Sequence, residues 1–415
     1  MASPGQLPTS ILRNSPSPTS AFARRLLLAL TMLAMQLAHA QKLTVLHTFS
    51  GPDGLMPYSG VTLDQGGNLY GTTYGGGSSG LGTVYQLKRH GSSYIHNQLH
   101  AFTGGNDGQQ PLGGLIFGPD GALYGTTSGG EVTSGTIFTL RPPATACHTA
   151  LCPWTEPLVY DVGGFNGIQP TYGQVAFDQS GYIYGTTAFG GNEYGDVYEL
   201  SRSGDGWTGK ELYVFGDPDA MYPPHNVVFD SAGNLYGTAD AGGTDDEGAV
   251  FELVPSGSGW SERILASFGA ADTGIGGFPV AGLIMDGAGN FYGATAGDDT
   301  TASVFELSPS GSSWRLTALH SFATSGNSVG PFGNLVMDNN GNLYGTTMAL
   351  GAFGMGNIFK LSPSGNGWIY TDLYDFSNSG DGEYPTGDLI IDSEGNLYGT
   401  NLGESGHGVV WELTP

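Results

Sequence analysis

Positive charge is scarce in this sequence. The 415 residues include 12 Lys and Arg against 37 Asp and Glu, and charged residues make up only 12% of the chain. A formal net charge of −25 repels the phosphates of nucleic acids and the headgroups of anionic lipids. We therefore expect no nucleic-acid partner. Long apolar runs are also lacking after the first forty residues, so we expect no transmembrane segment in the mature chain.

Cysteine is almost absent. Cys147 and Cys152 are the two cysteines, and they lie close together in an insertion between two expected strands. In an exported chain such a pair favours a local disulfide, whereas a zinc site needs two more ligands and only His148 is near. We expect a Cys147–Cys152 disulfide that closes a short loop and adds little to the stability of the fold.

Motifs that identify an enzyme are lacking as well. The glycine-rich run at 75–80 joins two expected strands with no helix behind it, so it is not a phosphate loop. No serine occupies the strand–turn–helix context of a nucleophile elbow. His96 and His100 have the spacing of helical zinc motifs, but four residues along a strand span about 13 Å, too far for one metal ion. A non-catalytic role is favoured.

The first forty residues are typical of a secretory signal. Three arginines precede or begin an apolar run at 26–35, and Ala38-His39-Ala40 offers a small-x-small cleavage pattern. We expect cleavage before Gln41 and a mature protein that is secreted, periplasmic or on the cell surface of a bacterial envelope. A retained membrane anchor is the alternative interpretation.

Glycine, with 72 residues, and repetition are what the sequence has in abundance. A Tyr-Gly pair recurs at intervals of 52 to 60 residues, with its tyrosine at Tyr70, Tyr124, Tyr184, Tyr236, Tyr292, Tyr344 and Tyr398. Around each pair, four short apolar runs alternate with turn residues, which predicts four strands in each copy. Seven copies predict an all-β fold, a seven-bladed β-propeller over residues 41–415.

The last copy lacks one strand. It ends after its third apolar run, at 409–413, and the run at 43–49 supplies the missing fourth one. Leu46 to Phe49 matches the end of other fourth strands, such as Leu319 to Phe322. We expect the N-terminal strand to complete the last blade, which closes the ring and removes two exposed strand edges.

The first turn of each copy also repeats. In Asp64-Gln65-Gly66-Gly67-Asn68 the carboxylate can accept hydrogen bonds from turn amides, and Gly67 can take a positive φ. Such aspartates lie one to a blade, so they cannot assemble one calcium site. For the Tyr-Gly pairs we expect packing between blades, with the glycine making room for a neighbouring ring.

These repeats resemble a known family. The Asp-x-x-Gly-Asn-Leu-Tyr-Gly-Thr-Thr core, the Gly-Thr-Val-Phe-x-Leu strand and the Pro-x-x-Gly before the first strand are similar to the GloVer tandem repeats of bacterial exported proteins. The resemblance covers nearly all of the chain after the first forty residues. It implies export and a repeat-built fold, and it implies no activity. The hairpin is also similar to that of NHL-type and of lyase or lactonase propellers.

Departures from the repeat indicate a candidate site. Just before the first strand, three copies carry Gly60, Gly114 and Gly282, and the other four carry Gln174, Asn226, Asn334 and Asp388, with His225 beside Asn226. First strands line the channel of a propeller, so these five side chains are candidate ligand contacts at its mouth. Oxygens of Asp388, Asn226 and Asn334 suit a hard cation such as calcium. Loops are also rich in Asn and Asp simply because these residues favour turns.

Two functions follow from these observations. The first is a monomeric, non-catalytic propeller that binds a protein or glycan at the cell surface through the loops that lead into its first strands. The alternative is a metal-dependent hydrolase or lyase, similar to a lactonase, with its site at the channel mouth. Acidic loops on the same face are the next candidate contacts: Asp217, Asp219, Asp240, Asp245, Asp246, Glu247, Asp272, Asp298 and Asp299.

Overall fold

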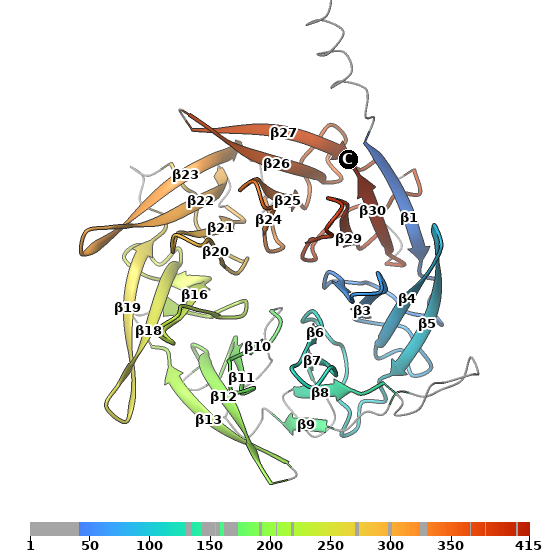
Figure 1. The fold of residues 1–415 in the computed structure, drawn as a ribbon, viewed down its shortest axis with the longest axis horizontal. Helices are drawn as coiled ribbons and strands as arrows, with labels where there is room; N and C mark the ends of the chain where they lie inside the picture. The colour runs from blue at the N-terminus through green and yellow to red at the C-terminus, as the bar shows by residue number, and fades with distance from the viewer. Residues whose placement is uncertain are drawn as a thin grey trace, which may run out of the picture. The chain divides into compact units, whose positions relative to one another are not determined.

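Each repeat folds into a four-stranded antiparallel sheet, as its apolar runs predict. In the first blade the inner strand β2 (Thr62–Leu63) pairs with β3 (Leu69–Thr73), which pairs with β4 (Thr83–His90) and through it with the outer strand β5 (Ser93–Ala101). A register shift between Val84 and Tyr85 marks a bulge in the outer pair. Seven such sheets form a ring, a seven-bladed β-propeller (Figure 1).

The other six blades repeat this order. Their strands are β6 (Ile116–Phe117), β7 (Leu123–Thr127), β8 (Thr136–Leu140) and β9 (Leu158–Asp161); β10 (Ala176–Phe177), β11 (Ile183–Thr187), β12 (Asp196–Ser203) and β13 (Gly206–Val214); β15 (Val228–Phe229), β16 (Leu235–Ala239), β18 (Ala249–Ser256) and β19 (Gly259–Ser267); β20 (Ile284–Met285), β21 (Phe291–Thr295), β22 (Thr301–Ser310) and β23 (Ser313–Ala323); β24 (Val336–Met337), β25 (Leu343–Thr347), β26 (Asn357–Ser364) and β27 (Gly367–Asp375); and β28 (Ile390–Ile391), β29 (Leu397–Asn401), β30 (Val409–Thr414) and β1 (Lys42–Thr48). A two-stranded ladder of β14 (Ala220–Met221) and β17 (Ala241–Gly242) lies beside the fourth blade.

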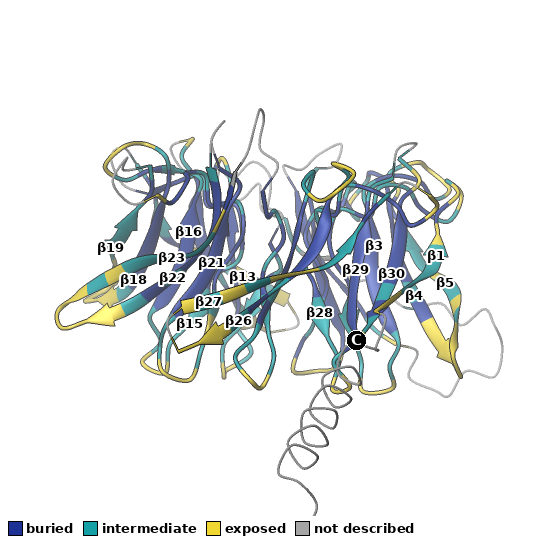
Figure 2. Ribbon diagram, turned by 90° about the horizontal axis from the view of Figure 1, so that it is seen from above, coloured by how far each residue is buried: buried dark blue, intermediate teal, exposed yellow. Residues whose placement is uncertain are grey.

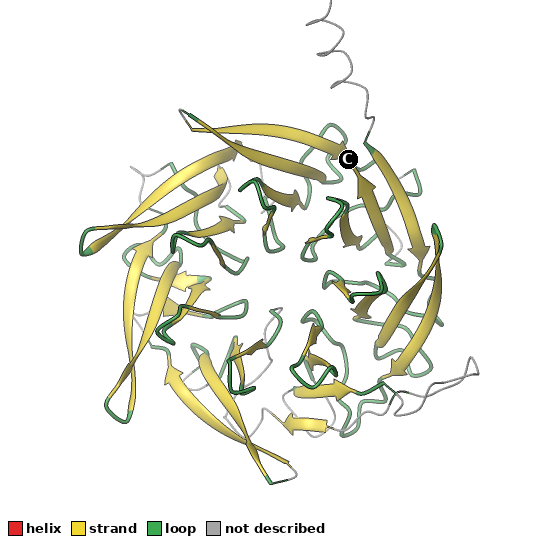
Figure 3. Cartoon of the chain, in the orientation of Figure 1, coloured by secondary structure: helices red, strands yellow, loops and turns green. Residues whose placement is uncertain are grey.

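The structure of the chain is a computed structural model. It describes residues 41–129, 135–142, 154, 158–161, 173–190, 193–204, 206–216, 220–269, 274–297, 301–323, 330–365, 367–377, 379–403 and 406–415. Those residues form strands and loops without a helix (Figure 3), so none of their segments is a helix able to cross a membrane. The expected signal and the Cys147–Cys152 disulfide lie outside the described residues.

The N-terminal strand closes the ring, as predicted. β1 pairs with β30 in a sheet of order β1-β30-β29-β28. Beyond β1, the Phe49 amide donates to the Gly408 carbonyl at 3.1 Å, and the Phe49 side chain is 1% exposed. The N-terminal strand β1 and the C-terminal strand β30 therefore belong to one blade. Pairing with β1 covers the edge of β30 that would otherwise be exposed.

In five of the blades, a residue with positive φ connects the blade to the one before it. Met56 has φ 54° and precedes Pro57. Its amide donates to the Gly406 carbonyl of the last blade at 2.9 Å, and its carbonyl accepts from the Tyr74 amide of the first blade at 3.0 Å. The same place before a proline is taken by Gln110, Tyr222, Phe278 and Tyr384, with φ between 54° and 59°. Each of these residues ties two blades together through its backbone.

The Tyr-Gly pairs pack between and within blades. The Tyr70 ring meets Phe117 of the next blade edge-on at 5.4 Å, which confirms the predicted inter-blade packing. Gly71 makes room for a ring of its own blade, however, and not for one of the neighbour. It is paired with Tyr85 of the third strand, and a Cβ on Gly71 would lie 2.4 Å from the Tyr85 hydroxyl.

The hairpin aspartates organise the first turn of each blade. Asp64 accepts hydrogen bonds from the Gly66 amide at 2.8 Å, from the Asn68 amide at 2.9 Å and from the Tyr70 hydroxyl at 3.0 Å. Gly67 has φ 78°, as the turn requires. In the second copy, where this aspartate is missing, the displaced Asp120 accepts from Tyr124 and takes over its role. Burial is greatest in the second strands, such as β3, and the outer hairpin tips are exposed (Figure 2).

Candidate functional site

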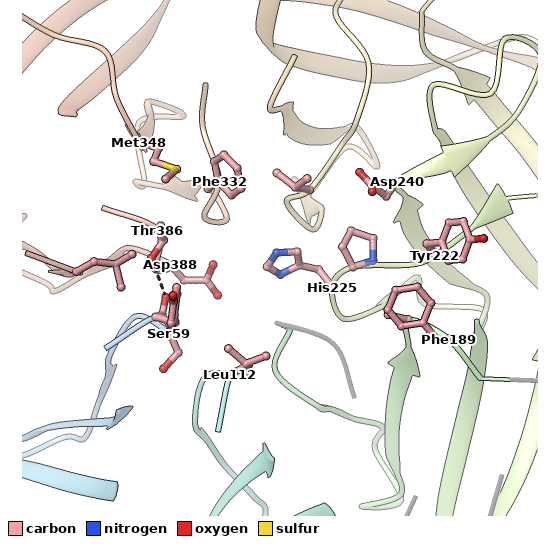
Figure 4. Close-up of a pocket in the computed structure, with 16 residues that line it drawn as sticks. Ser59, Leu112, Phe189, Tyr222, His225, Asp240, Phe332, Met348, Thr386 and Asp388 are labelled. Atoms are coloured by element: carbon pink, nitrogen blue, oxygen red, sulfur yellow. Dashed lines mark hydrogen bonds between the residues drawn. The ribbon is translucent and has the colours of Figure 1, made fainter. Parts of the chain in front are cut away.

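A cavity of about 510 Å³ opens at the channel mouth (Figure 4). It lies on the face formed by two kinds of loop, those that lead into the first strands and those that join the second and third strands. Its aromatic lining residues are Tyr58, Phe189, Tyr222 and Phe332, and its histidine and acidic lining residues are His225, Asp240 and Asp388. Its size and its mixture of apolar walls with a few polar groups are typical of sites for small ligands.

His225 lies at the wall of this cavity and is 7% exposed. Its imidazole donates to the backbone of Val280, and its Nδ1 atom is buried without a hydrogen-bond partner among the described residues. Burial lowers the pKa of His225, and the Asp388 carboxylate and the Val280 bond only partly offset this effect. The ring is therefore neutral near pH 7, with its free lone pair on Nδ1.

Asp388 comes from the loop before β28 and points toward His225 in Figure 4. One carboxylate oxygen accepts a hydrogen bond from the backbone amide of Asn334 at 2.7 Å, and the other accepts one from the side-chain Nδ2 of Asn334 at 3.1 Å. Asn334 Oδ1 in turn accepts from the Gly282 amide. A Cβ on Gly282 would also lie 3.1 Å from Asn226 Oδ1. The structure thus brings four of the five predicted site residues together around the mouth.

Gln174, the fifth predicted residue, lies against a different neighbour. Its amide would be 2.6 Å from a Cβ on Gly114, and a Cβ on Gly60 would meet the Asp388 carbonyl oxygen at 1.9 Å. The three glycines among the polar residues around the mouth therefore have a steric cause, because a neighbouring blade fills the space beside each of them. This packing accounts for part of the pattern that singled out these positions.

A hard cation at this ring would have to compete with existing hydrogen bonds. Both oxygens of Asp388 and the side-chain oxygen of Asn334 already accept from N–H groups. A calcium ion bound to Asp388, Asn226 and Asn334 thus remains a prediction, and it requires rearrangement of the Asn334 amide.

Asp240 is the acidic-loop residue that lines the cavity. Its Oδ1 atom is buried without a hydrogen-bond partner among the described residues, and burial raises its pKa above the ordinary value. Asp246 has a structural role, since it accepts from the Gly242 amide at 2.9 Å. Five of the other acidic-loop candidates lie outside the described residues: Asp217, Asp219, Asp272, Asp298 and Asp299.

The aromatic wall was missed by sequence reasoning. Phe189 is 47% exposed and lies 5.5 Å from the Tyr222 ring, at an interplanar angle of 54°. Exposure of a large aromatic side chain beside a cavity is unusual, because such side chains are normally buried. One signal was present: a phenylalanine in a glycine-rich loop, where the repeat needs no apolar side chain. Tyr222 follows β14, whose pairing with β17 also places Asp240 nearby.

The fold and the cavity define a seven-bladed β-propeller with a ligand-sized mouth. Within that class, the chain belongs to the Gloeobacter/Verrucomicrobia repeat family, whose sequence profile matches residues 33–156, 153–302 and 275–415. The predicted family is therefore confirmed. A search of curated proteins found no match.

Solved structures share the fold at low sequence identity. A protein proposed to be a 6-phosphogluconolactonase, from Bacteroides uniformis, is 16% identical, with a TM-score of 0.51 over 83% of this chain and 90% of that one. An ulvan lyase with a bound saccharide is 11% identical, with a TM-score of 0.51 over 89% of this chain and 95% of that one. At these identities the similarity shows a propeller and carries no information about chemistry.

Proposed function

We propose that this protein is an exported, non-catalytic propeller that binds a neutral glycan at its channel mouth. The proposal rests on one observation: the mouth cavity combines an exposed aromatic wall with carboxylates. The C–H faces of a sugar ring pack against aromatic rings, and its hydroxyls donate to carboxylate oxygens. Phe189 beside Tyr222 supplies the first kind of contact, and Asp240 with Asp388 supplies the second.

The charge of the cavity favours a neutral ligand over an anionic one. Its described lining includes Asp240 and Asp388 but no lysine or arginine. A sugar phosphate or a uronate would therefore meet carboxylates without a compensating cation, which costs free energy in a partly buried site. A protein partner is the second kind of ligand predicted for this face.

Equilibrium binding to an oligosaccharide panel tests the proposal. The panel contains neutral cello-, malto- and manno-oligosaccharides and uronate oligosaccharides of the same length. We expect a neutral member to bind and the uronates to bind more weakly. Binding of uronates alone, or of no member of the panel, would contradict the proposal.

Two phenylalanines provide a matched pair of variants for this test. Phe189→Ala removes an aromatic contact of the kind that dominates binding energies, so we expect about tenfold weaker binding. Phe353→Ala is the control, because Phe353 is 60% exposed and does not line the described cavity. Equal effects of the two substitutions would show that the ligand binds elsewhere.

A metal-dependent hydrolase or lyase is the second candidate function. The observation in its favour is the buried, unpartnered Nδ1 atom of His225 opposite Asp388, since a neutral imidazole and a carboxylate can bind a metal ion or move a proton. The same oligosaccharides, incubated with the protein and divalent metal ions, distinguish the two candidates. The binding proposal predicts no cleavage products. Metal-dependent products that are lost in His225→Asn would establish the enzyme.

A further inference from the structure

Three side chains with metal-binding atoms meet where the ring closes. His47 is near the end of β1, which completes the last blade, and His96 is in β5 of the first blade. Asp53 lies on the connection between these two blades. The cluster therefore spans the seam between the last blade, which contains the closing strand β1, and the first blade.

The geometry of the cluster is close to that of a metal site. His47 Nε2 lies 2.9 Å from Asp53 Oδ2, and one ligand atom from each of the three residues lies within 4.8 Å of the others. The two imidazole rings stack at 4.4 Å with an interplanar angle of 12°. His96 Nε2 is shielded from solvent and has no hydrogen-bond partner among the described residues. Within the described part of the chain, this is the one group of three such side chains.

We propose that His47, Asp53 and His96 bind a divalent transition-metal ion of the zinc type, which clamps the closing strand to the first blade. Two imidazole nitrogens and one carboxylate oxygen are a set that zinc accepts, with water in the fourth position. Calcium and magnesium prefer sites made of oxygens. The ion takes the place of the hydrogen bond between His47 Nε2 and Asp53 Oδ2, so His47 binds it as the tautomer that carries the ring proton on Nδ1.

The surroundings of the cluster hold its ligands in place. Asp53 Oδ1 accepts from the Ser50 amide at 2.8 Å and from the Ser50 hydroxyl at 2.9 Å, which leaves Oδ2 directed at the imidazoles. The buried rings of Phe49 and Tyr85 flank the histidines.

The movement needed to bind an ion is small. Ligand atoms on a tetrahedral zinc ion, at about 2.0–2.1 Å from the metal, lie about 3.3 Å from one another. The three ligand atoms already lie within 4.8 Å of one another. Side-chain rotations that move each ligand atom by about an ångström bring these separations to the values of a zinc site.

The other seams show why the cluster is special. The same places hold His100 with Asp107 at 3.2 Å in the next blade, and His320 stacked on Tyr370 at 4.3 Å further round the ring. These positions thus form polar or aromatic contacts between blades as a rule. Among the described residues, only at the seam between the last and first blades do all three side chains carry atoms able to bind a metal ion. The partners of His96 in this cluster lie on β1 and beyond it, and not on its own strand.

Thermal unfolding with added zinc chloride tests the proposal. For the purified protein stripped of metals by a chelator, we expect the melting temperature to rise by about 3 °C at a hundredfold excess of zinc over its Kd. Calcium chloride at the same concentration should have no such effect. His96→Tyr removes one ligand but restores the stack seen between His320 and Tyr370, so it should fold and lose the response to zinc. His100→Tyr is the control and should keep it.

A second measurement keeps the test decisive if His96→Tyr does not fold. Bound Co²⁺ in the native protein should give the visible absorption of a low-symmetry site of four or five ligands, and Asp53→Asn should weaken Co²⁺ binding at least tenfold. No effect of zinc on the native protein, or a response that survives His96→Tyr, would overturn the proposal. Loss of the response in His100→Tyr would also overturn it, since it would place the ion elsewhere.

Discussion

Asp196 has the most unusual environment of any carboxyl group in the described residues. It begins β12, is 0% exposed and is paired with Thr187. Equivalent places in other blades hold Thr83, which contacts Thr73 at 2.7 Å, and Asn357. Burial, with a smaller contribution from Glu211, raises the pKa of Asp196 to about 7. A charged group at this position therefore destabilises the fold at neutral pH.

Substitution of Asp196 should stabilise the protein in a pH-dependent way. Because the pKa is higher in the folded state than in the unfolded one, the penalty grows from about pH 4 to about pH 7 and is constant above that. Asp196→Asn, which copies the sixth blade, should raise the free energy of unfolding at pH 8 by about 1–3 kcal/mol and by much less at pH 4. Urea unfolding at both pH values measures the difference, and an equal gain at both would contradict the assigned pKa.

Asp392, in the hairpin of the last blade, provides a control, because its pKa is shifted in the opposite direction and its substitution should have the opposite effect on stability. Burial alone would raise the pKa of Asp392, but hydrogen bonds from Asn396, Glu394 and Tyr398 outweigh it, so the pKa lies below its ordinary value. The stability from this group is present above about pH 4 and is lost as the pH falls through the folded-state pKa. Asp392→Asn should therefore destabilise the protein at pH 8, where Asp196→Asn stabilises it.

At the scale of single residues, the sequence predicts the features that recur in every blade and does not predict those that occur in one blade alone. The turn aspartates, Gly67 and the inter-blade tyrosines could be predicted because seven copies state the same local requirement. Asp196 and Phe189 could not, since burial and exposure depend on which neighbour the fold brings near. The sequence analysis assigns a function to the polar residues that replace glycine around the mouth. Close approach of the next blade explains why the other copies carry glycine.

The closing strand is the element on which the ring depends. β1 is the fourth strand of the last blade, and Leu43 and Val45 on it pack against the buried cluster that includes Trp411. The sequence predicted this arrangement from a strand count, since one copy lacked a strand and the N-terminal segment matched it. The ladder of β14 and β17 was not predicted, because two-residue strands leave no periodic signal.

Deletion of residues 43–49 should destabilise the whole ring. It leaves β30 with an unpaired edge, and the burial of Phe49 alone contributes about 1.5–3 kcal/mol. We expect a lower melting temperature and aggregation, measured by calorimetry and light scattering. A permutant that joins Thr414 to Lys42 by a short linker and opens the β18–β19 hairpin restores the blade in one piece, so it should recover solubility. A deletion variant that melts and dissolves like the native protein would refute the role of β1.

At the scale of the whole molecule, repetition and asymmetry have different consequences. Seven similar sheets make the ring, and the number of copies could be counted in the sequence because each carries a Tyr-Gly pair. Two of the residues predicted at the channel mouth, His225 and Asp388, line the cavity, and a ligand there stays a prediction. The aromatic wall of the cavity could not be predicted, because it combines loops from several blades that no local pattern connects.

Hydrogen exchange with a bound neutral oligosaccharide tests the central claim most directly. The claim is that a glycan binds at the mouth of a closed seven-bladed ring, so the tightest-binding member of the neutral panel should slow exchange in the loops around Phe189, Tyr222, Asp240 and Asp388. Exchange in the hairpins that join the first and second strands, such as the turn at 64–68 between β2 and β3, should not change. Protection confined to those hairpins or to the outer strands, with the mouth loops unaffected, would contradict the account.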